Sequence, residues 1–249
     1  NELNSSRSRY DWHVCPCCVG NIPRTLLMMP TWTYVKSDSG IYVNMFAGST
    51  IKVDRVAGTD VEMVQETDYP WSGKIRLIVN PESEKEFSLF IRIPDRHTSE
   101  LYTPSPEVKG YISMKLNGET INPAVKNGYA SITGKWKAGD AVDLEIPMEV
   151  QVITSDDRVE ANRGRIAIKY GPLVYNVEEI DQKDIHQAIG PQPLKAEWDG
   201  KLLGGVMTVK GTWADGSPLL AIPNYARNNR NPKPVTEYRE GSIVWIKKN

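Results

Sequence analysis

Apolar and polar residues alternate in short runs from residue 41 onward, and this period of two constrains the fold more than any other feature. Successive strand side chains point to opposite faces, so each such run predicts a half-buried strand. The 19 Gly and 17 Pro residues supply the frequent turns that many short strands need. The runs are 41–46, 50–53, 61–67, 74–79, 87–93, 112–116, 129–133, 141–146, 149–153, 165–170, 173–177, 205–211, 219–223 and 242–247. With little helix between them, they predict packed antiparallel β-sandwiches.

Turn signals divide these runs. Asn117-Gly118 lies between two alternating segments and is typical of a type I′ hairpin turn. Segment 181–195 contains scattered Pro and Gly and is predicted to be a long loop. Segment 224–234 is polar and basic and is predicted to be a second loop, for which a domain interface and a ligand site both remain open.

One segment near the start has helical spacing. Asn21 is a candidate N-cap, and Pro23 would fall in the first turn, where its missing N–H costs little. Pro30 is expected to break or end the helix, and 32–35 could continue as a strained or second short helix. Three apolar residues at helical spacing are expected to form a buried stripe: Ile22, Leu26 and Met29.

Composition excludes several classes of protein. Lys and Arg number 30 and Asp and Glu number 31, so the net charge of −1 argues against a nucleic-acid partner. Hydrophobic residues make up 40%, enough to bury a core, yet no apolar run approaches the roughly 18 residues of a membrane span. The chain begins at Asn1 without an initiator Met or a signal-like segment. We therefore expect either a processed chain or a piece of a longer one.

The 3 cysteines all lie between Cys15 and Cys18, with His13 close by. Cysteines can simply fill a core, but three thiols and an imidazole also suit thiol chemistry or zinc, which soft thiolate ligands bind well. Adjacent cysteines are poorly placed to form a disulfide. His97 and His186 are isolated and are predicted to lie on the surface. A complete zinc site would therefore need ligands from outside this chain.

The segment Cys17-Cys-Val-Gly-Asn-Ile-Pro-Arg24 resembles the Cys-Cys-x-x-Asn-Ile-x-Arg signature of bacterial glycoside hydrolase families 127 and 146, the beta-L-arabinofuranosidase type. Two features depart from the family pattern: Val19-Gly20, and an apparent insertion at 101–110. Further similar segments occur in the same order along nearly the whole chain: 40–49, 69–73, 90–94, 136–140, 163–175 and 221–226.

The resemblance implies a mostly β chain, with two β-sandwich domains preceded by the last helix of an otherwise absent (α/α)6 barrel. We assign 1–38 to the end of the barrel, 39–150 plus 235–249 to the first sandwich, and 151–234 to the second. The resemblance also implies a retaining hydrolase that releases L-arabinofuranose from plant-derived glycans. The partners would be such an oligosaccharide or glycan and the rest of the barrel. We leave open a homodimer, and either the bacterial periplasm or the cytoplasm as location.

Carried over by motif, Cys17 would be both the catalytic nucleophile and a zinc ligand, and Cys18 a second zinc ligand. In the family a Glu and another Cys from the barrel complete the zinc site, and the acid/base Glu also lies outside this chain. We expect Cys15 to pack near the metal. Trp12 and His13 immediately precede the cluster and are candidates for the wall of a substrate pocket.

A non-catalytic carbohydrate-binding or structural β-sandwich module is the alternative. Trp71, Trp136 and Trp198 could serve as sugar platforms, although packing in a core or at a strand edge explains them equally simply. The acidic residues of 54–68 alternate with apolar ones and are expected to form a solvated sheet face.

Overall fold

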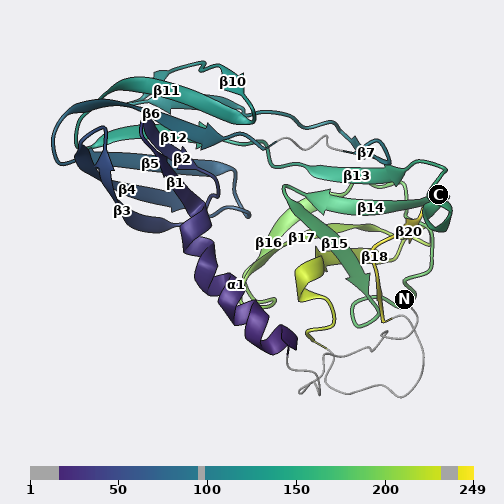
Figure 1. Ribbon diagram of the computed structural model, residues 1–249. Helices are drawn as coiled ribbons and strands as arrows, with labels where there is room; N and C mark the ends of the chain where they lie inside the picture. The colour runs from purple at the N-terminus through teal and green to yellow at the C-terminus, as the bar shows by residue number, and fades with distance from the viewer. Residues whose placement is uncertain (1–16, 95–98, 231–240) are drawn as a thin grey trace. The chain divides into compact units, whose positions relative to one another are not determined.

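The computed structural model describes residues 17–94, 99–230 and 241–249, which form two compact units (Figure 1). The first unit contains 17–94 and 109–147. The second contains 99–108, 148–230 and 241–249. The prediction of a mostly β protein with two sandwich-like units is confirmed, and α1 (Cys17–Thr33) is the one α-helix in the described ranges.

The first unit is a sandwich of two sheets, and it is built from the alternating runs of the sequence. One sheet has the order β1-β2-β6-β11-β10, with β1 at Tyr34–Ser37, β2 at Gly40–Val43, β6 at Lys85–Arg92, β11 at Tyr129–Trp136 and β10 at Val125–Lys126. The other has the order β3-β4-β5-β12-β8-β9, with β3 at Ser49–Val56, β4 at Thr59–Thr67, β5 at Lys74–Pro81, β12 at Asp140–Glu145, β8 at Ser113–Leu116 and β9 at Glu119–Thr120.

The core of this sandwich lies between the inner faces of its two sheets. Every second residue of β5 is buried there, and β6 contributes a matching row from the other sheet. Trp136 is also in the core, 2% exposed, and its indole N–H donates to the Phe87 carbonyl at 2.9 Å. Trp136 is therefore a packing residue and not a sugar platform.

Two local features of the sequence explain how the strands of this unit are joined. The Asn117-Gly118 hairpin is confirmed, because both residues have positive φ (51° and 87°) and Leu116 pairs with Glu119. Gly40 pairs with Ser88 in the parallel β2–β6 ladder, where a Cβ on Gly40 would lie 1.9 Å from the Ser88 carbonyl oxygen. Only glycine allows β2 to approach β6 this closely.

The second unit is one nine-stranded network with the order β16-β17-β18-β15-β14-β13-β7 and two short strands added at its middle. Its strands are β7 (Tyr102–Ser105), β13 (Val150–Ser155), β14 (Arg165–Tyr170), β15 (Leu173–Glu178), β16 (Lys195–Asp199), β17 (Val206–Thr212), β18 (Pro218–Pro223), β19 (Ser242–Ile243) and β20 (Ile246–Lys247). The 3-10 helices η2 (Glu160–Asn162) and η3 (Asn224–Ala226) complete it. Because β15 pairs with β14 through its first two residues and with β18 further on, it connects the two parts of the network.

The structure differs from our domain boundaries at two places. Residues 235–249 were expected in the first sandwich, but β19 pairs with β15 and β20 with β14, inside the second unit. Residues 101–108 lie within the range assigned to the first sandwich, yet β7 lies there and pairs with β13 in the second unit. Alternation shows which face of a strand is buried but not which core receives it, and the pairing partners decided both cases.

Three further strands were not predicted. β1 lies where a second short helix was expected, because the tight turn at Ser37–Gly40 allows 34–37 to pair with β2. β16 begins at Lys195, the end of the predicted long loop, and β10 has only two residues. Such short strands carry little periodic signal and form because a neighbouring strand offers its hydrogen bonds.

A buried ion cluster holds residues 224–230, the described part of the loop predicted at 224–234. The Glu178 side chain at the end of β15 is 1% exposed, and it accepts hydrogen bonds from the Asn228 backbone and, at 2.7 Å, from Arg230. Arg230 also pairs with Asp181, while Arg227 donates to the carbonyl of Ser242. Within the described residues these contacts account for both arginines as structural groups of the second unit.

We predict that Glu178→Ala lowers the free energy of unfolding by about 1–3 kcal/mol, because it removes one of the two carboxylates that pair with the largely buried Arg230 and also the acceptor of the Asn228 backbone N–H. The matched control is Glu197→Ala, which breaks the exposed Lys210–Glu197 pair and should cost less than about 1 kcal/mol. Urea unfolding of the 249-residue chain measures both. Equal losses in the two variants would contradict the structural role given to Glu178.

Candidate active site

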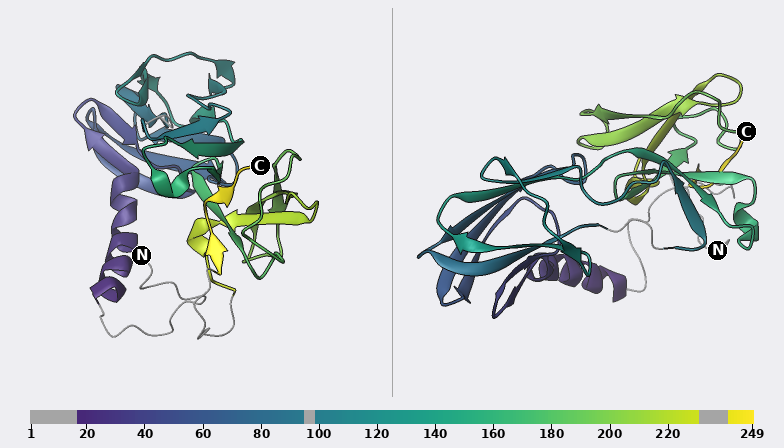
Figure 2. Two further views of the ribbon diagram at one scale, coloured as in Figure 1. Left: turned by 90° about the vertical axis from the view of Figure 1, so that its right-hand side faces the viewer. Right: turned by 90° about the horizontal axis from the view of Figure 1, so that it is seen from above.

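The candidate active site lies at the N-terminal end of α1, the helix drawn in purple in Figures 1 and 2. Cys17 is the first residue of α1, and its side chain is exposed. Cys18 follows in the same turn, although its side chain lies outside the described residues. The structure therefore places both predicted zinc ligands at one helix end and says nothing of Cys15, Trp12 or His13, which also lie outside the described residues.

The helix is longer at both ends than we predicted. Asn21 is not its N-cap but lies in the second turn, where its side-chain oxygen accepts a hydrogen bond from Arg24 at 2.6 Å. The prediction that Pro30 breaks or ends the helix is wrong, because α1 continues through Pro30 to Thr33. Two hydroxyl groups support the backbone around it: Thr31 donates to the Met28 carbonyl and Thr33 to the Met29 carbonyl.

The prediction that Ile22, Leu26 and Met29 form a buried stripe is wrong for this chain, since Met29 is half-buried and the other two side chains are exposed. Ile22 and Leu26 are each 59% exposed and Leu27 is 80% exposed, whereas core residues of the same unit are below 10%. Figure 1 shows the reason: α1 extends away from the sandwich, and β1, which follows it directly in the chain, is among the elements that it contacts. An apolar helix face of this size normally packs against another element.

Asn44 attaches the C-terminal end of α1 to the sandwich. Its backbone N–H donates to the Thr33 carbonyl at 2.8 Å, and its side-chain amide donates to the Trp32 carbonyl at 3.1 Å. The last carbonyls of a helix have no partner inside the helix, so Asn44 satisfies two of them. Its side-chain oxygen in turn accepts a hydrogen bond from the Tyr129 hydroxyl on β11 at 2.7 Å. The sandwich thus fixes the position of the helix that carries Cys17.

We predict that Asn44→Ala loosens the last turn of α1, because it removes both side-chain hydrogen bonds while leaving the backbone one. Amide hydrogen exchange of 31–33 should become faster, with a stability loss of about 1–2 kcal/mol. Tyr129→Phe is the control, since it removes only one of these bonds and should have a smaller effect. Unchanged exchange in Asn44→Ala would refute the attachment.

The described residues supply part of a zinc site at most. None of them form a group of three or more His, Cys, Asp or Glu side chains able to hold a metal. Thiolates are nevertheless the ligands that zinc prefers, and two consecutive thiols at an accessible helix end suit the partial site that the sequence indicates. His186 is exposed, as predicted, while His97 lies outside the described residues.

The remaining sequence predictions concern side chains elsewhere on the sandwiches. Trp71 is half-buried in the loop before β5, and Trp198 on β16 is 50% exposed. The acidic residues of 54–68 are exposed or half-buried, which confirms a solvated sheet face. In addition, no helix in the described ranges is long and apolar enough to cross a membrane.

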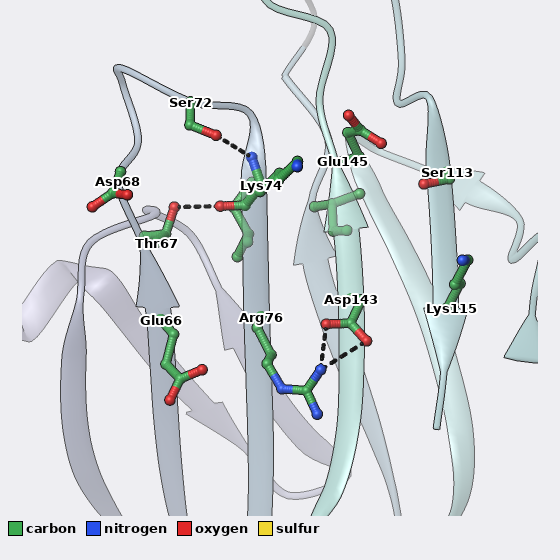
Figure 3. Close-up of a pocket in the computed structure, with 12 residues that line it drawn as sticks. Glu66, Thr67, Asp68, Ser72, Lys74, Arg76, Ser113, Lys115, Asp143 and Glu145 are labelled. Atoms are coloured by element: carbon green, nitrogen blue, oxygen red, sulfur yellow. Dashed lines mark hydrogen bonds and ion pairs between the residues drawn. The ribbon is translucent and has the colours of Figure 1, made fainter. Parts of the chain in front are cut away.

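A polar groove on the first sandwich was missed by the sequence analysis. It has a volume of about 600 Å³ and lies over the outer face of β4, β5, β12 and β8, beside the loop between β4 and β5 (Figure 3). Arg76 and Asp143 form an ion pair in its floor, at 2.8 Å. The groove brings together residues far apart in the chain, which is why no sequence motif marks it.

Comparison with protein families decides the affiliation of the chain. Residues 40–148 match the model described as "Beta-L-arabinofuranosidase, GH127 middle domain", and residues 150–240 match the "Glycoside hydrolase family 127 C-terminal domain". The chain belongs to glycoside hydrolase family 127. The boundary between the two models at 148–150 agrees with the start of the main part of the second unit at Met148.

Known members of family 127 resemble the chain along most of its length. A non-reducing end beta-L-arabinofuranosidase of Bifidobacterium longum subsp. longum is 27% identical over 214 residues, which is 81% of this chain and 30% of that protein. Among solved structures, a family 127 beta-L-arabinofuranosidase from Geobacillus stearothermophilus T6 has a TM-score of 0.82 at 31% identity, covering 98% of this chain and 39% of that one.

A second solved structure, described as a GH127 beta-arabinofuranosidase, has a TM-score of 0.84 at 28% identity and covers 97% of this chain and 40% of that one. The chain therefore spans well under half the length of the relatives that it matches.

Proposed function

We propose that this chain is the C-terminal portion of a retaining beta-L-arabinofuranosidase in which Cys17 is the nucleophile. The observation that carries the proposal is the position of Cys17, accessible at the start of a helix that the family 127 sandwich holds by its other end. The names of the relatives, which are beta-L-arabinofuranosidases, support the choice of sugar. The substrate would be a plant-derived glycan or oligosaccharide with a terminal L-arabinofuranose.

In this proposal the Cys17 sulfur attacks the anomeric carbon, and a C–S bond forms as the glycosidic C–O bond breaks. A carboxylic acid from outside this chain protonates the departing oxygen. Water then attacks the same carbon, the carboxylate takes its proton, and the Cys17 thiolate leaves. Two inversions give overall retention of configuration.

Zinc fits the donor set of this helix end. Cys17 and Cys18 would hold the ion together with a Glu and a Cys from outside the chain. When bound, zinc favours the thiolate form of its cysteine ligands and stabilises that thiolate as a leaving group.

The exposed apolar side of α1 supports the rest of an (α/α)6 barrel as the partner of this chain. Ile22, Leu26 and Leu27 would be covered by neighbouring barrel helices, in the way that helix faces of this kind are usually buried. The relatives are more than twice as long as the part that this chain matches, which leaves room for such a domain.

The test is Cys17→Ser in the intact protein, assayed on an aryl beta-L-arabinofuranoside. We predict a loss of at least about 10³-fold in kcat/KM, because a serine hydroxyl is a far weaker nucleophile than a thiolate. Cys15→Ser is the matched control and should retain most activity. Full turnover in Cys17→Ser, with Cys15→Ser equally active, would overturn the assignment of the nucleophile.

A non-catalytic carbohydrate-binding role is the second candidate, and the groove of the first sandwich favours it. This role does not exclude the first, since a chain can carry a binding surface beside a catalytic helix.

A further inference from the structure

The groove over β4, β5, β12 and β8 is lined by charged side chains of both signs. In one row across the sheet, Glu66 pairs in register with Arg76, Arg76 with Asp143, and Asp143 with Lys115. In the next row Lys74 lies opposite Glu145, and Glu145 opposite Ser113. Figure 3 shows these side chains around the same space.

Interleaved charges on the outer face of an antiparallel sheet have a simple structural explanation, because opposite charges on neighbouring strands stabilise the pairing. If strand pairing alone explained these charges, the side chains of each oppositely charged register pair should form an ion pair. Among the described residues only Arg76 and Asp143 form one in the groove. Lys74 and Glu145 lie directly opposite each other, yet neither side chain makes an ion pair or hydrogen bond in the described parts of the chain. The same holds for Glu66 and Lys115.

The loop at one end of the groove is held in place by its own hydrogen bonds. The Thr67 hydroxyl donates to the Lys74 carbonyl at 2.8 Å, and the Ser72 hydroxyl accepts from the Lys74 backbone at 3.2 Å. Tyr69 packs its ring against Phe46 in the core, with ring centroids 5.7 Å apart. The wall is thus formed before any ligand arrives, which reduces the entropic cost of binding.

We propose that this groove binds a short neutral oligosaccharide. Four carboxylates and three cationic side chains line the groove, so the charges nearly balance and the groove does not select an ion of one sign. They do offer both acceptors and donors, which a ligand rich in hydroxyl groups can use at once. The volume of about 600 Å³ lies within the range of small-molecule sites, roughly 300–1,000 Å³.

The existence of the site rests on the groove residues alone. The choice of a glycan among neutral polyhydroxyl ligands rests on the proposed function. Glu145 and Lys74 are the groups expected to contact the ligand most directly, because each is charged, faces the groove and keeps its hydrogen-bonding capacity free among the described residues.

The experiment is calorimetric titration of the 249-residue chain with a neutral arabino-oligosaccharide and, separately, with an oligogalacturonate as an anionic ligand. We expect saturable binding of the neutral ligand, weakened about tenfold by Glu145→Ala and by Lys74→Ala. The matched control is Glu86→Ala, which removes an exposed strand carboxylate of β6 in the other sheet and should leave the affinity unchanged. Thermal unfolding of each variant verifies that the sandwich is intact.

Three results would overturn the proposal: no saturable binding, equal weakening by Glu86→Ala, or tighter binding of the oligogalacturonate. The titration measures binding at the groove and needs no turnover, whereas the Cys17→Ser assay measures turnover and does not test the groove. Failure of the groove and failure of the proposed catalytic role are therefore separate results.

Discussion

The packing of two β-sheets through their apolar inner faces is the interaction on which the rest of the first unit depends. Ile75, Leu77 and Val79 on one sheet face a row from β6 on the other, and each is at most 2% exposed. Burial of one such side chain contributes about 1.5–3 kcal/mol, so the two rows fix the register of the strands. Once the register is fixed, every alternate side chain must point outward, and the polar groove and the anchor of α1 follow from that.

Polar contacts at the edge of this core then position the candidate active site. Asn44 follows β2 and links the end of α1 to Tyr129 on β11. The strands therefore hold this helix of 17 residues by its C-terminal end and leave Cys17, at the other end, accessible. A helix held at one end, with its apolar side uncovered, is consistent with a catalytic element that is completed by another domain.

Much of the fold could be predicted from the sequence, because the period of two is a local property. β14 begins and ends where its run does, and the Asn117-Gly118 hairpin has the predicted turn. The second unit was harder. β19 and β20 are too short to show which core they join, and their pairing with β15 and β14 depends on the whole network.

The candidate site could be predicted only in part. The Cys17-Cys18 motif was expected just before a helix, and the structure instead begins α1 at Cys17 itself. The buried stripe on α1 was expected from helical spacing, but burial depends on a partner, and periodicity alone does not say whether that partner lies in the same chain. The groove could not be predicted from the sequence at all. Glu66, Lys74 and Glu145 come together only through strand pairing, and no sequence motif links them.

The central claim is that Cys17 and Cys18 are half of a zinc–thiolate site completed from outside this chain. Zinc K-edge X-ray absorption on the intact protein, combined with its metal content, tests this most directly. The account predicts about one zinc per molecule with about three sulfur ligands at about 2.3 Å and one oxygen ligand. Absence of zinc, or a first shell of nitrogen and oxygen alone, would contradict it.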